Sequence, residues 1–138
     1  MPAKYDLDDI KKIASDWLIS RDDTVWVSPK KKTTKAIQHV LGEEEGDALT
    51  TIAKGFLELK TEGFLRATYY RDRNVTVDIY GLPAYRGHNW YVKFCKQTEC
   101  GDTFITSISF HPLNERMSTE CGKQYEVTYT GERPWKDS

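Results

Sequence analysis

The chain has 138 residues, of which 38% are hydrophobic, 12% aromatic and 30% charged, and its formal net charge is −1. This length predicts a single domain with a buried core, and the near-neutral charge argues against a protein that is wrapped in nucleic acid on all sides. The sequence shows no apolar run long enough to cross a bilayer and no hydrophobic leader after Met1. We therefore expect no membrane partner and a cytoplasmic location.

The cysteines Cys95, Cys100 and Cys121 form an odd set in a chain for which we expect no signal peptide. This favours free thiols in a reducing compartment. A zinc site that uses these cysteines with His111 is an alternative, but no tight Cys-x-x-Cys pair is present to anchor it. We therefore expect neither a metal nor a cofactor.

The first part of the chain has apolar residues at helical spacing. Asp6 is the predicted N-cap of a first helix, whose apolar stripe reaches Leu18. The apolar run 24–27 is more typical of a strand or an extended segment than of a helix. The lysines at 30–32 are expected in a solvated loop, with contact to a polyanion as the alternative.

Two further helices are predicted before residue 64. Thr33 or Thr34 is the expected cap of a short helix that ends at Gly42. A longer helix starts near Asp47, and Gly63 closes this helical half of the chain.

From Phe64 onward the apolar period changes to two, which indicates β-strands. Helices followed by strands with short connections predict an α+β fold, in which two to three N-terminal helices pack on one face of a mostly antiparallel sheet of four to five strands. We expect one domain over residues 1–138, with 131–138 a flexible tail anchored by Trp135. The predicted strands are 64–70, 75–80, 88–95, 103–110 and 124–129.

Alternation within these strands predicts which side chains face the core. In 88–95, Trp90, Val92 and Phe94 point inward, while Tyr91 and Lys93 point outward. Strands 103–110 and 75–80 alternate in the same way. Around 103–110 the predicted inward residues are Phe104, Thr106, Ile108 and Phe110, and the predicted outward residues are Ser107, Ser109 and His111. In 75–80 the predicted inward residues are Val75, Val77 and Ile79, and the predicted outward residues are Asp78 and Tyr80.

The position of Arg66 has two interpretations. It either shares the face of Phe64, two residues before it, or is rotated to the other face by a bulge. The register of the strands, and so the set of side chains that touch, is left open by the sequence.

This outward set can carry out acid–base cleavage of a phosphodiester. A base removes the 2′-hydroxyl proton, an acid protonates the leaving 5′-oxygen, and cations stabilise the phosphorane. His111 has a side chain that titrates near neutrality, and Lys93 and Arg66 can hold phosphate. Tyr80 and Tyr91 can stack a base or bond the phosphate.

Each of these residues also has a purely structural interpretation. His111, which precedes Pro112, can simply close a strand, and Lys93 can be a solvated guard against aggregation. Tyr80 and Tyr91 can be ordinary cross-strand aromatics. The remaining polar residues assigned to substrate binding are Ser109 on the outward face, and Arg86 and His88 at a predicted hairpin.

Several short motifs follow one another in a recognisable order. They are Phe64–Arg66, Asp78–Tyr80, Trp90–Phe94 and Ile108–His111. This order, after the helices, resembles the MqsR-type toxins of the RelE-like group of bacterial toxin ribonucleases, over about residues 47–112. The resemblance implies an endoribonuclease that acts on single-stranded RNA, and an antitoxin or immunity protein as its partner.

The resemblance also implies roles for individual residues. Arg66 falls where the family has a catalytic lysine, Tyr91 falls on its active-site tyrosine, and His111 falls where a second catalytic lysine follows Ser-Phe. Val77 replaces a functional glutamine. Because guanidinium does not deprotonate, His111 is the expected general acid or base, with Arg66 and Lys93 stabilising phosphate and Tyr91 orienting it.

A different class of function is compatible with the same pattern. A helix-backed sheet with exposed aromatics can be a non-enzymatic module that binds a protein or nucleic acid, here through Tyr80, Tyr91 and Trp90. A redox or zinc protein that uses the cysteines is a third possibility.

Overall fold

The computed structural model describes residues 2–21, 27–29 and 31–135. Three helices precede the long strands in these ranges, which confirms the predicted α+β class. Two 3-10 turns, η1 (Thr61–Gly63) and η2 (Arg71–Arg73), flank the second strand. The elements are α1 (Leu7–Ser20), β1 (Val27–Pro29), α2 (Lys31–Leu41), α3 (Glu45–Glu58), β2 (Phe64–Tyr70), β3 (Val75–Tyr85), β4 (His88–Glu99), β5 (Asp102–Pro112), β6 (Met117–Ser118) and β7 (Gln124–Tyr125).

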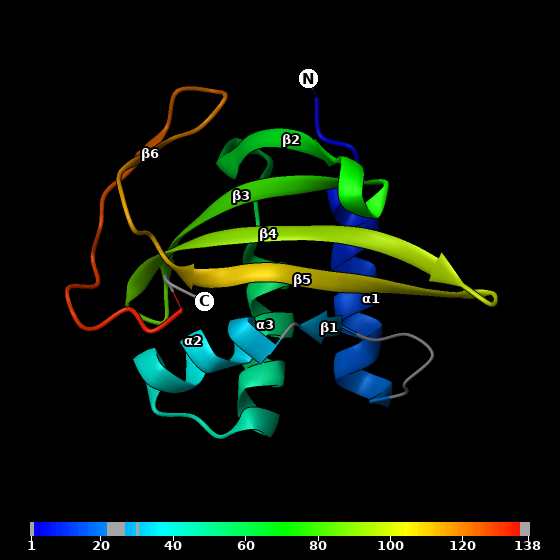
Figure 1. Cartoon of the computed structure of the whole chain (residues 1–138), viewed down its shortest axis with the longest axis horizontal. Helices are drawn as coiled ribbons and strands as arrows, with labels where there is room; N and C mark the ends of the chain where they lie inside the picture. The colour runs from blue at the N-terminus through cyan, green and yellow to red at the C-terminus, as the bar shows by residue number, and fades with distance from the viewer. Residues whose placement is uncertain (1, 22–26, 30, 136–138) are drawn as a thin grey trace.

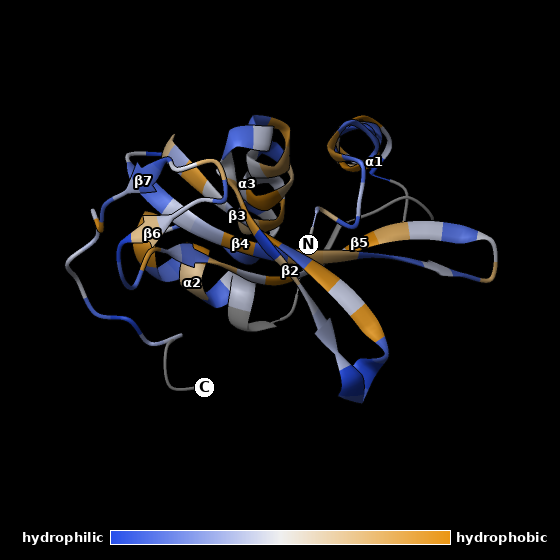
Figure 2. Ribbon diagram, turned by 90° about the horizontal axis from the view of Figure 1, so that it is seen from above, coloured by the Kyte–Doolittle hydropathy of each residue, from blue (hydrophilic) through white to orange (hydrophobic). Residues whose placement is uncertain are grey.

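The main sheet has the strand order β1-β5-β4-β3-β2. β1 runs parallel to β5, and the other neighbours are antiparallel. Figure 1 shows α1 and α3 behind this sheet and α2 below its β5 side, and Figure 2 shows the same layers from above. α1 and α3 thus cover one face, here called the inner face, and α2 lies along the β5 edge. Each helix in the described ranges is too short or too polar to cross a bilayer.

The helix boundaries follow local capping chemistry. The Asp6 side chain accepts a hydrogen bond from the backbone N–H of Asp8 at 3.0 Å, which confirms the predicted N-cap of α1. Gly42 has a φ of 68°, and this left-handed backbone ends α2 as predicted.

α2 begins earlier than expected. It starts at Lys31, so Lys31 and Lys32 belong to a helix and not to a loop; Lys30 lies outside the described residues. The hydroxyl of Thr33, a predicted cap, instead lies 3.4 Å from the carbonyl oxygen of Ser107. Of the apolar run 24–27, Val27 starts β1 and residues 24–26 lie outside the described residues.

The inner face of β4 forms the centre of the core. Trp90, Val92 and Phe94 are fully buried there, as the alternation predicted. Phe56 from α3 meets Phe94 edge to face, with ring centroids 5.2 Å apart, and Phe110 from β5 joins the same cluster. Aromatic rings therefore account for much of the contact between helices and sheet.

The predicted faces of β3 are wrong. Tyr80 is 2% exposed on the inner face and stacks on Phe94 at 5.8 Å. The buried Asp78 carboxylate accepts hydrogen bonds from the backbone N–H groups of Lys4 and Tyr5 at 2.9 and 3.0 Å, so it holds the N-terminal segment against the sheet. The alternation misled because β3 is buried on both faces: its predicted core residue Val77 belongs to an outer cluster with Cys95 and Ile108.

A bulge explains why the prediction for β5 is only partly correct. Lys93 pairs with Ser109, but the next residue of β4, Phe94, pairs with Ser107. Ile108 is the additional residue, and the alternation changes phase there. Phe110 points inward and Ser109 and His111 outward, as predicted; Ser107 is instead buried, and Phe104, Thr106 and Ile108 lie on the outer side.

The region after β5 folds back over the outer face. Met117 of β6 and Tyr125 of β7 pack with Leu113 into a small cluster, which also contacts Tyr91. The predicted strand 124–129 is reduced to two residues and pairs with β6 in a separate sheet.

The last described residues are held in place. Trp135, the predicted anchor of the tail, is 1% exposed. Arg133 adds a second attachment, because its guanidinium donates to the carbonyl oxygen of Leu113 at 3.0 Å and to the side chain of Asn114 at 2.9 Å. Residues 136–138 lie outside the described residues.

Candidate active site

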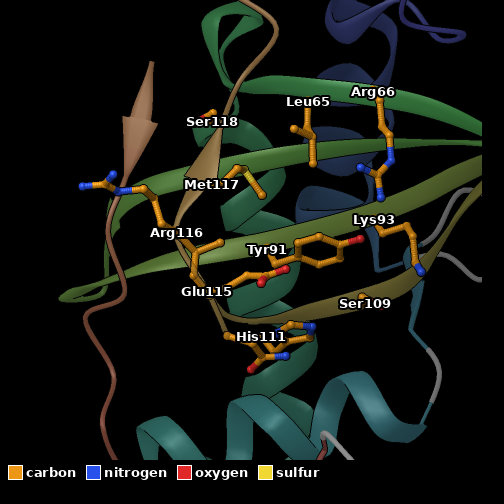
Figure 3. Close-up of a pocket in the computed structure, with 12 residues that line it drawn as sticks. Leu65, Arg66, Tyr91, Lys93, Ser109, His111, Glu115, Arg116, Met117 and Ser118 are labelled. Carbon is orange, nitrogen blue, oxygen red and sulfur yellow. The ribbon is translucent and has the colours of Figure 1, made fainter. Parts of the chain in front are cut away.

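A pocket of about 490 Å³ opens on the outer face of the sheet. β2, β4 and β5 form its floor, and the segment between β5 and β6 forms one wall (Figure 3). Five of the residues singled out from the sequence line it together. The lining residues are Leu65, Arg66, Tyr91, Lys93, Ser109, His111, Leu113, Asn114, Glu115, Arg116, Met117 and Ser118.

Strand register brings the central pair of the pocket together. Tyr91 lies directly opposite His111 in the β4–β5 ladder, and Lys93 lies opposite Ser109. The Tyr91 and His111 rings are nearly parallel, at 13°, with centroids 5.2 Å apart. Cross-strand neighbours on one face are the closest side-chain pairs that a sheet offers, so this contact follows from the register.

A second bulge brings Arg66 to this face. The ladder shifts between Phe64 and Arg66, so Leu65 is the additional residue and Arg66 pairs with the outward Ile79. Of the two interpretations that the sequence left open, the bulge is the observed one. Figure 3 shows the guanidinium group of Arg66 turned over the sheet toward Tyr91 and Lys93.

The pocket presents positive charge. The ammonium group of Lys93 donates to the Tyr70 hydroxyl at 2.6 Å and lies 5.2 Å from the centroid of that ring. In the described part of the chain, neither Lys93 nor Arg66 lies within ion-pair distance of a carboxylate. Both cations therefore keep their charge available for an anion.

The hydroxyl of Tyr91 is a hydrogen-bond donor at neutral pH. Burial raises its pKa above the ordinary 10.0, while the nearby charges of Lys93 and Arg66 act in the opposite direction. The raised pKa keeps the phenol protonated at neutral pH.

The orientation of the His111 ring is defined by its neighbours. Its Nδ1 lies 2.7 Å from the carbonyl oxygen of Pro112, which can only accept a hydrogen bond, so Nδ1 donates. Trp135 stacks on the ring at 6.0 Å and 23°, so the imidazole lies between Trp135 and Tyr91. In a neutral imidazole that donates through Nδ1, the lone pair lies on Nε2.

Three other predicted site residues lie elsewhere. Tyr80 is in the core under the helices, so its assignment to the exposed face is wrong. Arg86 lies 3.5 Å from the carboxylate of Glu43, and the His88 ring is 3.1 Å from the Thr128 hydroxyl; neither lines the pocket. Both stand at the β3–β4 hairpin, where a sequence pattern cannot show which way the turn directs its side chains.

The exposed aromatic surface of the alternative binding module is also largely absent. Of its three residues, Trp90 is fully buried and Tyr80 is nearly so. Tyr91 alone reaches the outer face, where it is half-buried beside His111.

Sequence reasoning missed the wall of the pocket. Asn114, Glu115 and Arg116 follow β5 without strand or helix periodicity, so no pattern placed them near the sheet. Arg116 pairs with Glu126 at 2.7 Å. The usable signal was the polar run after Pro112, since connecting loops at strand ends commonly carry site residues.

The cysteines do not converge on His111. Cys95 is buried in the outer cluster, while Cys100 and Cys121 are exposed. Over the described residues, no group of three His, Cys, Asp or Glu side chains is arranged to hold a metal ion.

Comparisons of this chain with protein-family models, with curated proteins and with solved structures return no match.

Proposed function

We propose that this protein is a metal-independent endoribonuclease that cleaves single-stranded RNA in the outer-face pocket. One observation carries the proposal: the stacked Tyr91–His111 pair shares an open pocket with the cations of Arg66 and Lys93. An imidazole, a phenol and two cations are the groups that phosphodiester cleavage needs when the 2′-hydroxyl is the nucleophile.

The reaction proceeds by transfer of the phosphoryl group within the RNA. The 2′-oxygen attacks phosphorus and loses its proton, the bond to the 5′-oxygen breaks, and that oxygen takes up a proton. The products are a 2′,3′-cyclic phosphate and a 5′-hydroxyl. The imidazole of His111 carries out one of the two proton transfers, which contributes a factor of about 10² to 10⁴ in rate.

The other pocket residues act on the phosphate. Arg66 and Lys93 stabilise the charge that builds up on its non-bridging oxygens. Arg66 acts as a cation and hydrogen-bond donor and not as a proton-transfer group, because guanidinium stays protonated. The protonated Tyr91 hydroxyl donates to the same phosphate and orients it.

The motif resemblance supports a bacterial toxin that acts in the cytoplasm. In this proposal a cognate antitoxin or immunity protein neutralises it by covering the pocket. Because Arg66 and Lys93 are not ion-paired within the described residues, an acidic segment of such an inhibitor suits this surface.

Expression in bacteria tests the proposal. The wild-type chain is expected to arrest growth and to degrade RNA, and His111→Ala to restore growth at the same protein level. Lys54→Ala is the control, since Lys54 is exposed on α3 and does not line the pocket; it is expected to arrest growth as the wild type does. Normal growth with folded wild-type protein, or arrest by His111→Ala, would contradict the proposal.

A further inference from the structure

A second hollow of about 440 Å³ lies on the outer face, where β2 ends and η2 begins. Its lining is Tyr70, Arg71, Asp72, Arg73 and Ile108. The η2 turn that carries the arginines is closed by Asn74, whose left-handed backbone (φ 51°) lets its N–H donate to the carbonyl oxygen of Arg71 at 3.2 Å. The arginine pair therefore projects from a defined turn.

The second hollow adjoins the first pocket through two links. Lys93 lines the first pocket, and its ammonium group bonds to Tyr70, which lines the second. The bulge in β5 places two consecutive residues on the outer side, so that Ser109 lies in the first pocket and Ile108 in the second. A chain molecule that leaves the first pocket past Lys93 meets the Tyr70 ring next.

The charges of this region suit a polyanion. Arg71 and Arg73 are exposed, and in the described part of the chain neither lies within ion-pair distance of a carboxylate. Asp72 offsets one of the two charges. With Arg66 and Lys93, and with Glu115 of the first pocket set against them, the two adjoining hollows carry an excess of positive charge, although the chain as a whole has a net charge of −1. Positive charge is therefore concentrated along the surface that runs from the first pocket to the second hollow.

We propose that this hollow is a second nucleotide-binding subsite of the ribonuclease. Arg71 and Arg73 bind phosphates of the RNA strand beyond the scissile bond, and the half-buried Tyr70 ring stacks a base. A splayed single strand presents its bases and its phosphates to such a surface together, whereas a duplex hides its base faces. The subsite rests on the proposed ribonuclease function, and it makes single-stranded RNA of several nucleotides the preferred substrate.

The test compares substrates of two lengths. Arg71→Gln with Arg73→Gln removes both charges, and Lys54→Gln, exposed on α3 at the helical face, is the control. We measure kcat/KM for a dinucleotide and for an unstructured twelve-nucleotide RNA. In the double variant the ratio of the long to the short value is expected to fall about tenfold, because two exposed phosphate contacts are lost.

The salt dependence gives a second readout. The slope of log affinity for the twelve-nucleotide RNA against log salt is expected to become less steep by about 1.4 in the double variant, which corresponds to two lost contacts on a single strand. This affinity is measured by fluorescence anisotropy in the His111→Ala background, so it does not depend on cleavage. Tyr70→Leu is expected to weaken the same binding, and Tyr70→Phe to retain it.

The two proposals fail in different ways. If the wild type cleaves both substrates and the double variant keeps the wild-type ratio, the subsite is overturned while the ribonuclease stands. If the wild type cleaves neither RNA, the ribonuclease proposal fails, and unchanged anisotropy in the double variant would overturn the subsite as well.

Discussion

Gly81 determines how closely the β6–β7 hairpin packs on the sheet. A Cβ atom added at this position would lie 2.6 Å from the Met117 sulfur and 2.6 Å from a ring carbon of Tyr125. Non-bonded heavy atoms prefer separations of about 3.5–4.0 Å. In Gly81→Ala both side chains must therefore retreat by about 1 Å, and with them the wall of the pocket that Met117 lines.

The cost of this change follows from overpacking. An extra methyl in a packed cluster typically costs about 1–3 kcal/mol. We expect Gly81→Ala to lower the free energy of unfolding by about 2 kcal/mol in urea denaturation, and to raise the KM for RNA because the wall moves. Gly46→Ala is the matched control: the added Cβ meets no atom within 4 Å in α3, so the stability is expected to stay equal or to rise by up to about 1 kcal/mol.

A double-mutant cycle identifies the contact responsible. If the clash is with Tyr125, Gly81→Ala costs at least about 0.5 kcal/mol less in a Tyr125→Ala background than in the wild type. Equal stability of Gly81→Ala and the wild type would refute the packing argument, and an unchanged cost in the Tyr125→Ala background would place the strain at another contact.

Three further changes test the fold and the site. Burial raises the pKa of the Asp78 carboxyl above its ordinary 3.8, so the folded protein binds the Asp78 proton more tightly than the unfolded chain does. This tighter proton binding stabilises the fold below about pH 4, and the stabilisation is lost as the pH rises through the pKa of folded Asp78. Urea titrations from pH 4 to 7 are therefore expected to show Asp78→Asn gaining on the wild type as the pH rises, and a constant difference would contradict this. Tyr91→Phe is expected to lower kcat at least about tenfold, whereas Tyr80→Phe, in the core, leaves kcat/KM unchanged in the same cleavage assay. A larger loss of activity in Tyr80→Phe than in Tyr91→Phe would contradict the placement of Tyr91 in the site and of Tyr80 in the core. Trp135→Ala removes the ring stacked on His111, and we expect it to lower the unfolding free energy by about 3–5 kcal/mol and to lower kcat in the protein that remains folded. Trp135→Phe is expected to retain most of the stability and most of kcat. An unchanged kcat in folded Trp135→Ala would show that the activity does not depend on the stacked ring.

The helical half of the fold was largely readable from local chemistry. The Asp6 cap and the Gly42 stop act through backbone geometry within a few residues, so a sequence pattern is sufficient to find them. The same holds for β4, where large apolar residues alternate with Tyr91 and Lys93 and only one face is covered by helices.

The errors arose where long-range packing overrides alternation. Tyr80 and Asp78 look like outward residues beside valines and isoleucines, yet the Tyr80 ring lies among core aromatics and Asp78 is bonded to the backbone of the N-terminal segment. The bulge at Ile108 changes which side of the sheet the β5 residues face, and no glycine or proline marks the bulge in the sequence.

The candidate site was predictable where it depends on register alone. Tyr91, Lys93, Ser109 and His111 meet because two adjacent strands alternate in phase near the bulge. The wall at 113–118 was not predictable, since it has no periodic pattern and is positioned by contacts with Gly81 and Tyr125, which are distant in sequence.

Cleavage of an unstructured RNA by the purified chain in excess chelator tests the central claim most directly. The wild type is expected to release a fragment ending in a 2′,3′-cyclic phosphate, and His111→Ala to react about 10² to 10⁴ times more slowly with an unchanged circular dichroism spectrum. Equal rates for the two proteins, or cleavage by the wild type that appears only when a divalent metal is added, would contradict proton transfer by His111 as the basis of the activity.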